Sequence, residues 1–249
     1  MCGFTGFVGN FINPREKLEY CNKILFHRGP DMSDIFYEEK SKIGLAHSRL
    51  SILDISSNAI QPIKDDLGNV LVFNGEIYNY KIIKEKLDKI KSIKWNSTSD
   101  TEILFNSLIY FGVENTLEII EGMYAFCFVK KDNNTIYLCR DISGEKPLYY
   151  YQSDDKLIFS SEVKPINYLV DQKKISSDIL NNYINFNFNW NNNSVFLNIF
   201  SLKPGNYLKF DLNKKKLSIN QFWKYEEKYH FFKKNNQYSK KNFDNLLKN

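Results

Sequence analysis

An apolar, glycine-containing stretch begins at the second residue of the chain. Residues 2–9, CGFTGFVG, combine β-prone and apolar side chains with glycines, which predicts a buried strand with close backbone neighbours. Most globular chains leave their first residues loose. A second residue that already enters a core strand therefore needs an explanation, and the rest of the sequence has to supply it.

The overall composition is that of a globular protein. The 249 residues are 43% hydrophobic, 25% charged and 16% aromatic, which argues against disordered, collagen-like and membrane-spanning chains. A chain of this length buries roughly three-quarters of its unfolded surface, as one large domain or two small ones. No apolar run reaches membrane length and no signal peptide opens the chain, so we expect a cytoplasmic protein with no membrane partner.

Charge and cysteine content narrow the function classes. The net charge of +5 is weak, so we expect no nucleic-acid partner, although the Lys-rich residues 224–249 leave a basic binding segment as a minor alternative. Cys2, Cys21, Cys127 and Cys139 form no Cys-x-x-Cys pair, and no histidines accompany them at metal-ligand spacing. We therefore predict no metal site, and scattered thiols fit a reducing compartment better than a disulfide framework.

Hydrophobic periodicity predicts strands, then helices, then strands again. In the first half we predict strands at 2–9, 43–53 and 70–74, a helix over 77–90 with Asn79 or the preceding turn as its cap, a helix from Ser99-Asp100 to Gly112, and a short helix over 114–121. In the second half we predict antiparallel strands at 124–130, 135–140, 147–152 and 156–161, a helix over 176–185, and strands near 194–203, 206–211 and 216–223. This order of elements favours a layered α+β domain.

Cys2 is the strongest chemical candidate. Removal of Met1 is expected before a residue as small as cysteine, and it would leave a thiol and a free α-amine on one residue. An α-amine has a pKa of about 7.7–8, so it can act as the general base for its own side chain. No histidine is then required. The alternative is that Cys2 merely follows Met1 in a buried strand.

Three other positions carry groups that could assist such a nucleophile or bind its substrate. Asn74-Gly75-Glu76 lies at a predicted strand-to-helix transition, where a side-chain amide and a glycine N–H can converge on an oxyanion; the alternative is an ordinary Asn-Gly turn. Arg49 lies in a strand with alternate apolar residues, and its planar guanidinium suits a carboxylate unless it is simply solvated. Asp100 is either a helix N-cap or a counter-charge for a ligand ammonium.

Several ordered motifs carry a family resemblance. They are Cys2-Gly3, His27–Asp31 (HRGPD), Arg49–Asp54 (RLSILD), Gln61-Pro62, Asn74–Asn79 (NGEIYN), Ser99–Glu102 (SDTE), Glu121–Phe126 (EGMYAF), Arg140-Asp141, Gly144–Tyr149 (GEKPLY), Ser160–Glu162 and Leu202–Gly205. In order and rough spacing they resemble the class II glutamine amidotransferase domain of glutamine-hydrolysing asparagine synthetases. The resemblance runs from Cys2 to about Trp223, and the HRGPD and RLSI blocks favour the asparagine synthetase branch.

The resemblance implies a fold and a nucleophile. The expected fold is the N-terminal nucleophile hydrolase sandwich, an α+β architecture with four αββα layers, in which two antiparallel sheets lie between helices. Cys2, freed of Met1, would attack the side-chain amide of glutamine, and its α-amine would carry the proton. Asn74 and the Gly75 N–H would form the oxyanion hole.

The resemblance also implies how glutamine is bound. Arg49 would hold the substrate α-carboxylate, and Glu76 and Asp100 would bind its α-ammonium. The remaining residues expected to line the glutamine are Leu50, Ser51, Ile52 and Leu53. Hydrolysis of glutamine would need no cofactor or metal.

Other motif residues receive no chemical role. His27, Arg28 and Asp31 belong to the matching blocks, and we interpret them as loop-organising residues. His47 and His230 are interpreted as structural or surface residues, because this mechanism needs no imidazole. The Phe-rich residues 186–190 are interpreted as core or as an interface.

The expected domain division is 2–223 for the amidotransferase domain and 224–249 for a connector-like tail. The family continues into an ATP-pyrophosphatase domain with a Ser-Gly-Gly-x-Asp-Ser loop, which these residues lack. A synthetase domain, on a separate chain or on a longer version of this one, would accept the ammonia and amidate aspartate or a related acceptor with ATP and Mg. The alternatives are an ammonia donor to a sugar-modifying partner and a non-catalytic interaction module; a homodimer is also compatible.

Overall fold

The computed structural model describes residues 2–51, 56–170, 174–188 and 193–224. The strands are β1 (Gly3–Val8), β2 (Met32–Glu38), β3 (Ile43–Arg49), β4 (Ile63–Lys64), β5 (Val70–Ile77), β6 (Gly122–Lys130), β7 (Thr135–Arg140), β8 (Tyr149–Gln152), β9 (Leu157–Ser160), β10 (Ile199–Ser201), β11 (Asn206–Asp211) and β12 (Lys216–Gln221). The helices are α1 (Pro14–Leu25), α2 (Tyr80–Ile90), α3 (Asp100–Tyr110), α4 (Val113–Ile119), α5 (Val163–Leu169) and α6 (Ser177–Phe186), with short 3₁₀ turns at Phe26–Arg28 and Ser57–Ala59.

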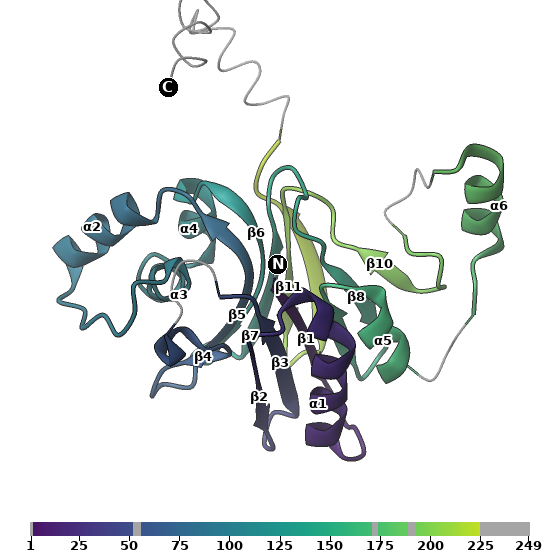
Figure 1. The fold of residues 1–249 in the computed structure, drawn as a ribbon, viewed down its shortest axis with the longest axis horizontal. Helices are drawn as coiled ribbons and strands as arrows, with labels where there is room; N and C mark the ends of the chain where they lie inside the picture. The colour runs from purple at the N-terminus through teal and green to yellow at the C-terminus, as the bar shows by residue number, and fades with distance from the viewer. Residues whose placement is uncertain (1, 52–55, 171–173, 189–192, 225–249) are drawn as a thin grey trace, which may run out of the picture.

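The strands form two six-stranded antiparallel sheets that lie face to face (Figure 1). The first sheet has the order β10-β8-β9-β1-β3-β2, and the second has the order β12-β11-β7-β6-β5-β4. Helices α1 and α5 pack on the outer face of the first sheet, whereas α2, α3 and α4 pack on the outer face of the second. The four-layer αββα sandwich expected from the sequence is therefore confirmed.

Alternation along the strands explains the layers. In β5, Val70 and Val72 face the other sheet, while Leu71 and Phe73 face the helices. In β3, Ile43 and Leu45 likewise point into the layer between the sheets. Successive side chains of a strand point to opposite faces, so both faces of each sheet carry apolar residues only when both are covered. Full burial of a Leu or Phe side chain contributes roughly 1.5–3 kcal/mol.

One correction bears directly on the site. Pairing of β5 with β6 continues to Ile77 opposite Gly122, so Asn74-Gly75-Glu76 lies inside a strand and not at a strand-to-helix transition. The helix predicted from Ile77 begins only at Tyr80. Asn79 is its N-cap residue, but the side chain of Asn79 bonds Ile119 O and Glu121 N instead of capping the helix.

Further predictions differ from the structure at their boundaries. The strand predicted at 43–53 ends at Arg49, and the one predicted at 194–203 is reduced to β10. Helices α1 and α5 and strands β2 and β4 were not predicted. Phe186 and Phe188 are 60% and 56% exposed, so the core interpretation of this stretch is wrong for them. No helix of the described chain is both long and apolar enough to cross a membrane.

Candidate functional site

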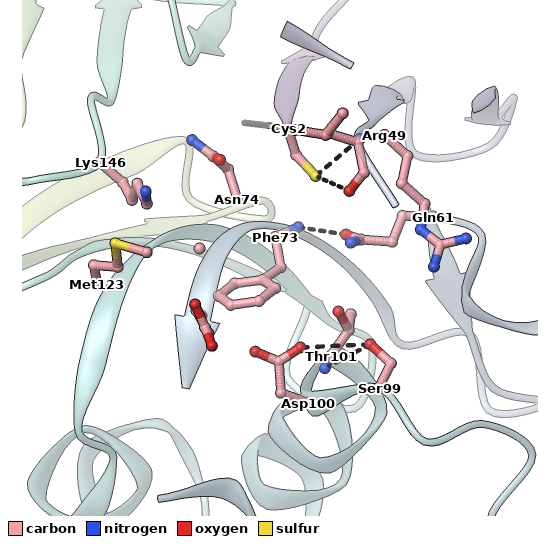
Figure 2. A pocket seen from close by; sticks show the side chains of 13 residues that line it. Cys2, Arg49, Gln61, Phe73, Asn74, Ser99, Asp100, Thr101, Met123 and Lys146 are labelled. Carbon is pink, nitrogen blue, oxygen red and sulfur yellow. Dashed lines mark hydrogen bonds between the residues drawn. The ribbon is translucent and has the colours of Figure 1, made fainter. Parts of the chain in front are cut away.

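A pocket opens where the layer between the two sheets changes from apolar to polar. Along β3 the inward-facing residues Ile43 and Leu45 are followed by His47 and Arg49, and along β5 Val70 and Val72 are followed by Asn74 and Glu76. Figure 2 shows side chains from both sheets and from α3 pointing toward one another here. The pocket residues are Cys2, Arg49, Leu50, Gln61, Phe73, Asn74, Gly75, Glu76, Ser99, Asp100, Thr101, Met123 and Lys146. Its volume is about 90 Å³, so only a small group or molecule fits inside it.

Cys2 lies directly before β1, with its thiol in the pocket (Figure 2). The Leu50 N–H donates to Cys2 Sγ at 3.4 Å, and the Leu50 carbonyl oxygen lies 3.6 Å from the same sulfur. Burial raises the pKa of the Cys2 thiol, although the contact with Leu50 and the charge of Arg49 pull it down. The thiol is therefore not a thiolate by its surroundings alone, and it needs a base.

A chain of polar contacts holds the backbone of Cys2. Arg28 Nε donates to the Cys2 carbonyl at 3.0 Å, and Arg28 Nη1 donates to Glu162 Oε1 at 3.1 Å. His27 Nε2 lies 2.8 Å from the same carboxylate oxygen. Gly3 leaves room for this chain of contacts, because a Cβ there would lie 2.9 Å from Arg28 Cδ and would displace the Arg28 side chain. The residues interpreted as loop-organising thus anchor the residue that carries the thiol.

The edge of β5 that faces away from β6 forms the opposite side of the pocket. β4 pairs only with Val70 and Leu71, so beyond them other groups bond the edge of β5. The Phe73 N–H donates to Gln61 Oε1 at 2.6 Å, and the Ile77 N–H donates to Asp100 Oδ2 at 2.8 Å.

The N–H group of Gly75 points in the same direction as those of Phe73 and Ile77, because N–H direction alternates along a strand. The N–H groups of Phe73 and Ile77 point out of the sheet, so the N–H of Gly75 between them does the same and faces the pocket. A Cβ on Gly75 would lie 2.1 Å from the Met123 carbonyl, so only glycine fits. The side chain of Asn74 is buried, and its Nδ2 has no hydrogen-bond partner among the described residues. Two neighbouring residues of the pocket wall thus each carry an N–H donor, and the donor of Asn74 is unsatisfied.

The charged residues of the pocket come from β3, β5 and α3. Arg49 is buried at the end of β3, and its Nη1 donates to Ser56 O at 2.9 Å. Asp100 is the first residue of α3, and Ser99 is the N-cap, because Ser99 Oγ accepts from Thr101 N at 3.1 Å. The N-cap interpretation of Asp100 is therefore wrong. Burial and the charge of Glu76 raise the pKa of Asp100 to about 6.

The structure brings most of the predicted site residues together. Those that line the pocket are Cys2, Arg49, Leu50, Asn74, Gly75, Glu76 and Asp100. Ser51 does not line it, and its N–H donates instead to Asp31 Oδ2 at 2.7 Å. Ile52 and Leu53 lie outside the described residues, as does His230.

Sequence reasoning missed several lining residues, of which Lys146 is the most notable. Lys146 is buried, although lysine rarely is. It belongs to a loop whose N–H groups converge on Asp141: those of Ser143 and Glu145 donate to Oδ1 and that of Lys146 to Oδ2, each at 3.0 Å. The signal in the sequence was the GEKPLY block, to which no role was given. Within the described ranges, no three His, Cys, Asp or Glu side chains form a group that could hold a metal ion.

The chain resembles known proteins in sequence and in fold. Asparagine synthetase [glutamine-hydrolyzing] 1 of Bacillus subtilis strain 168 is 32% identical over 211 residues, covering 82% of this chain and 33% of that protein. Asparagine synthetase [glutamine-hydrolyzing] 2 of the same strain is 32% identical over 240 residues, covering 91% and 31%. The chain therefore spans about a third of the length of these curated relatives.

Solved structures agree on the fold. The glutamine phosphoribosylpyrophosphate amidotransferase of B. subtilis, in complex with ADP and GMP, aligns with a TM-score of 0.63 at 19% identity, over 89% of this chain and 49% of that chain. This likeness confirms the N-terminal nucleophile hydrolase sandwich. The model of a family described as the glutamine amidotransferase domain matches residues 1–223. This chain belongs to the class II glutamine amidotransferase family.

Proposed function

We propose that this chain, once Met1 is removed, hydrolyses the side-chain amide of glutamine to give glutamate and ammonia. The observation that carries the proposal is the meeting of the Cys2 thiol with the unsatisfied amide of Asn74 and the edge N–H of Gly75 in one small pocket. A nucleophile facing two hydrogen-bond donors is the arrangement that acyl transfer requires.

Charge in the pocket suits a free amino acid. Arg49 would hold the α-carboxylate through its planar guanidinium, and Glu76 and Asp100 would bind the α-ammonium. Two cations, Arg49 and Lys146, and two carboxylates, Glu76 and Asp100, line this small cavity. Charges of both signs match a zwitterion better than a residue inside a peptide, which has no α-ammonium and no α-carboxylate. Leu50 would line the substrate, and Ser51, Ile52 and Leu53 are proposed as its continuation.

The α-amine of Cys2 would supply the base. Burial raises the pKa of the thiol, and no histidine is among the described residues that line the pocket. The amine would take the thiol proton as Sγ attacks the amide carbon, while Asn74 and Gly75 stabilise the oxyanion. Collapse of this adduct would break the C–N bond, and the same proton would leave with ammonia. Water would then hydrolyse the thioester to glutamate and restore the thiol.

The ammonia would be used by a synthetase. Relatives named asparagine synthetases are longer than this chain, so we propose a synthetase domain or partner that amidates aspartate or a related acceptor with ATP and Mg. Residues 2–223 would be the glutaminase domain and 224–249 the connector to that partner. The hydrolysis itself would need no cofactor, because thiol and amine come from one residue. A homodimer remains a prediction, which sedimentation can test.

Glutamine hydrolysis by the purified protein tests the proposal. Mass spectrometry first establishes that Met1 is removed, and released ammonia and glutamate are then measured. Cys2→Ala should abolish the activity, whereas Cys21→Ala should keep it, because Cys21 belongs to α1 and is buried against the outer face of the first sheet. A processed protein that releases no ammonia, or a Cys2→Ala variant that stays active, would refute the proposal and favour a non-catalytic interaction module.

A further inference from the structure

His47 is a fully buried titratable residue that the proposed chemistry does not use. It lies on the inner face of β3, after Leu45 and before Arg49, so its ring points into the layer between the sheets. A polar ring in this layer costs free energy unless it is hydrogen-bonded. Its position beside the pocket suggests that the bond it makes has a purpose there.

The ring bonds the opposite sheet. His47 Nε2 lies 3.0 Å from the carbonyl oxygen of Phe73 on β5. A carbonyl only accepts, so Nε2 carries the proton of this bond. His47 Nδ1 is buried and has no hydrogen-bond partner in the described chain, as fits the bare nitrogen of a neutral ring. Burial lowers the pKa of His47 to about 4, so the neutral form persists near pH 7.

The carbonyl that His47 holds belongs to the peptide unit that leads into Asn74. The N–H of Phe73 is held from the same side by Gln61 at 2.6 Å. Because β4 pairs only with Val70 and Leu71, these two side chains replace a neighbouring strand at this point of β5. The orientation of the peptide before Asn74 sets where the Asn74 amide points, and Gly75 follows directly.

We propose that His47 is a positioning residue that links the substrate-binding strand β3 to the oxyanion strand β5. Its neutral Nε2–H holds the Phe73 carbonyl, so that the donors of Asn74 and Gly75 stand at a fixed distance from the Cys2 thiol across the gap between the sheets. This inference rests on the glutaminase function proposed above. A small misplacement of such donors costs up to about 100-fold in rate.

Two substitutions separate the hydrogen bond from the bulk of the ring. Gln in His47→Gln keeps an N–H donor at a similar reach, whereas Leu in His47→Leu keeps volume and leaves the Phe73 carbonyl unpaired. We expect the kcat of His47→Leu to fall about 10- to 100-fold with KM for glutamine within about twofold of wild type. His47→Gln should retain kcat within about fivefold, as a rescue by the conservative variant.

Alkylation of Cys2 serves as a control, because its rate would change if the variants disturbed the structure around the thiol. Alkylation of Cys2 by iodoacetamide, followed by mass spectrometry, displaces iodide and forms no oxyanion. Its rate should stay within about twofold of wild type in both variants, if only the oxyanion donors have moved. Val129→Ala removes methyl groups from the same inter-sheet layer at the other end of β6, and its kcat should not change despite its lower stability.

The inference is overturned if His47→Leu keeps kcat within about threefold, if His47→Gln loses as much as His47→Leu, or if alkylation slows in step with kcat. Should His47→Leu fail to fold, His47→Asn, whose shorter side chain does not reach the Phe73 carbonyl, takes its place with the same expected values. A wild-type protein without glutaminase activity refutes the proposed function instead. If the wild type is active and His47→Leu has an unchanged kcat, only the role of His47 is refuted.

Discussion

The two sides of the pocket are supported by different chemistry. The backbone of Cys2 is held by ionic contacts that run outward to solvent: the side chains of Arg28, Glu162 and His27 are 11%, 23% and 55% exposed. The edge of β5 is held by buried side chains. An ionic support near solvent is screened by salt, whereas the buried bonds that Gln61 and His47 make with Phe73 carry no charge near pH 7 and are not screened.

The difference matches what each side has to do. In the proposed reaction the amine of Cys2 would exchange protons during each turnover, and a support that reaches solvent leaves room for its charge to change. The proposed oxyanion donors, Asn74 and Gly75, would have to keep one geometry, because donors that reorganise stabilise a transition state less. Gln61, His47 and Asp100, which bond the edge of β5, are all nearly inaccessible to solvent. The substitutions below separate the two sides.

Removal of an oxyanion donor on the β5 side should have the largest effect. We expect Asn74→Ala to lower kcat for glutamine hydrolysis about 100- to 1,000-fold, because one preorganised donor has about this value, with a smaller change in KM. Steady-state kinetics measure both. Asn106→Ala is the matched control, since the Asn106 amide bonds Glu102 O within α3 and does not line the pocket. A kcat within tenfold of wild type would contradict the oxyanion role.

The next effect concerns substrate binding from β3. We expect Arg49→Lys to raise KM for glutamine about 10- to 100-fold with kcat within a few-fold, because lysine keeps the charge but loses the planar pair of donors. Substrate-concentration series measure the split between KM and kcat. An unchanged KM with a reduced kcat would instead place Arg49 in the chemical step.

Much of this arrangement could be read from the sequence, and what could not has a physical cause. Alternation of apolar residues around RLSI identified Arg49, and the Asn-Gly-Glu motif after an apolar run identified Asn74. Sequence patterns could not show that β5 continues to Ile77. The Ile77 N–H is bonded by Asp100, which is distant in sequence. Lys146 was missed because its place depends on Asp141, which folds the loop around it. Contacts between segments far apart carry no local signal.

The titration of Asp100 should change binding by about tenfold. Below its pKa of about 6 the carboxyl is neutral and cannot pair with an ammonium, so KM for glutamine should rise about tenfold from pH 7 to pH 5. Asp100→Asn should have a high KM that no longer depends on pH in this range. A wild-type KM that is flat between pH 5 and pH 7 would remove Asp100 from ammonium binding.

The same raised pKa has a consequence for stability. The folded protein binds this proton more tightly than the unfolded chain, so the contribution of Asp100 is fully present below its ordinary pKa of 3.8 and is lost as pH rises through about 6. At pH 7.5 the charged carboxyl therefore destabilises the fold. Urea unfolding should show that Asp100→Asn has a larger free energy of unfolding there, by about 1–3 kcal/mol.

The smallest effects should come from the ionic support of Cys2. Glu162→Gln removes the charge that Arg28 and His27 share, and we expect kcat to fall about two- to fivefold, because a partly exposed ion pair contributes about 1 kcal/mol or less. His27→Gln should change kcat less than twofold, since the more exposed His27 reaches Cys2 only through Glu162 and Arg28.

Salt distinguishes this support from the β5 side. Burial pushes the pKa of Glu162 up, but hydrogen bonds from His27 and Arg28 leave it below its ordinary value of 4.5. The carboxylate is therefore charged near pH 7. Raising NaCl from about 0.05 M to about 0.5 M screens its ion pairs and should narrow the kcat difference between wild type and Glu162→Gln. The same change should leave the ratio between wild type and His47→Leu unaltered, because that contact is buried and neutral. Equal salt responses would mean that both sides of the pocket rest on the same kind of support.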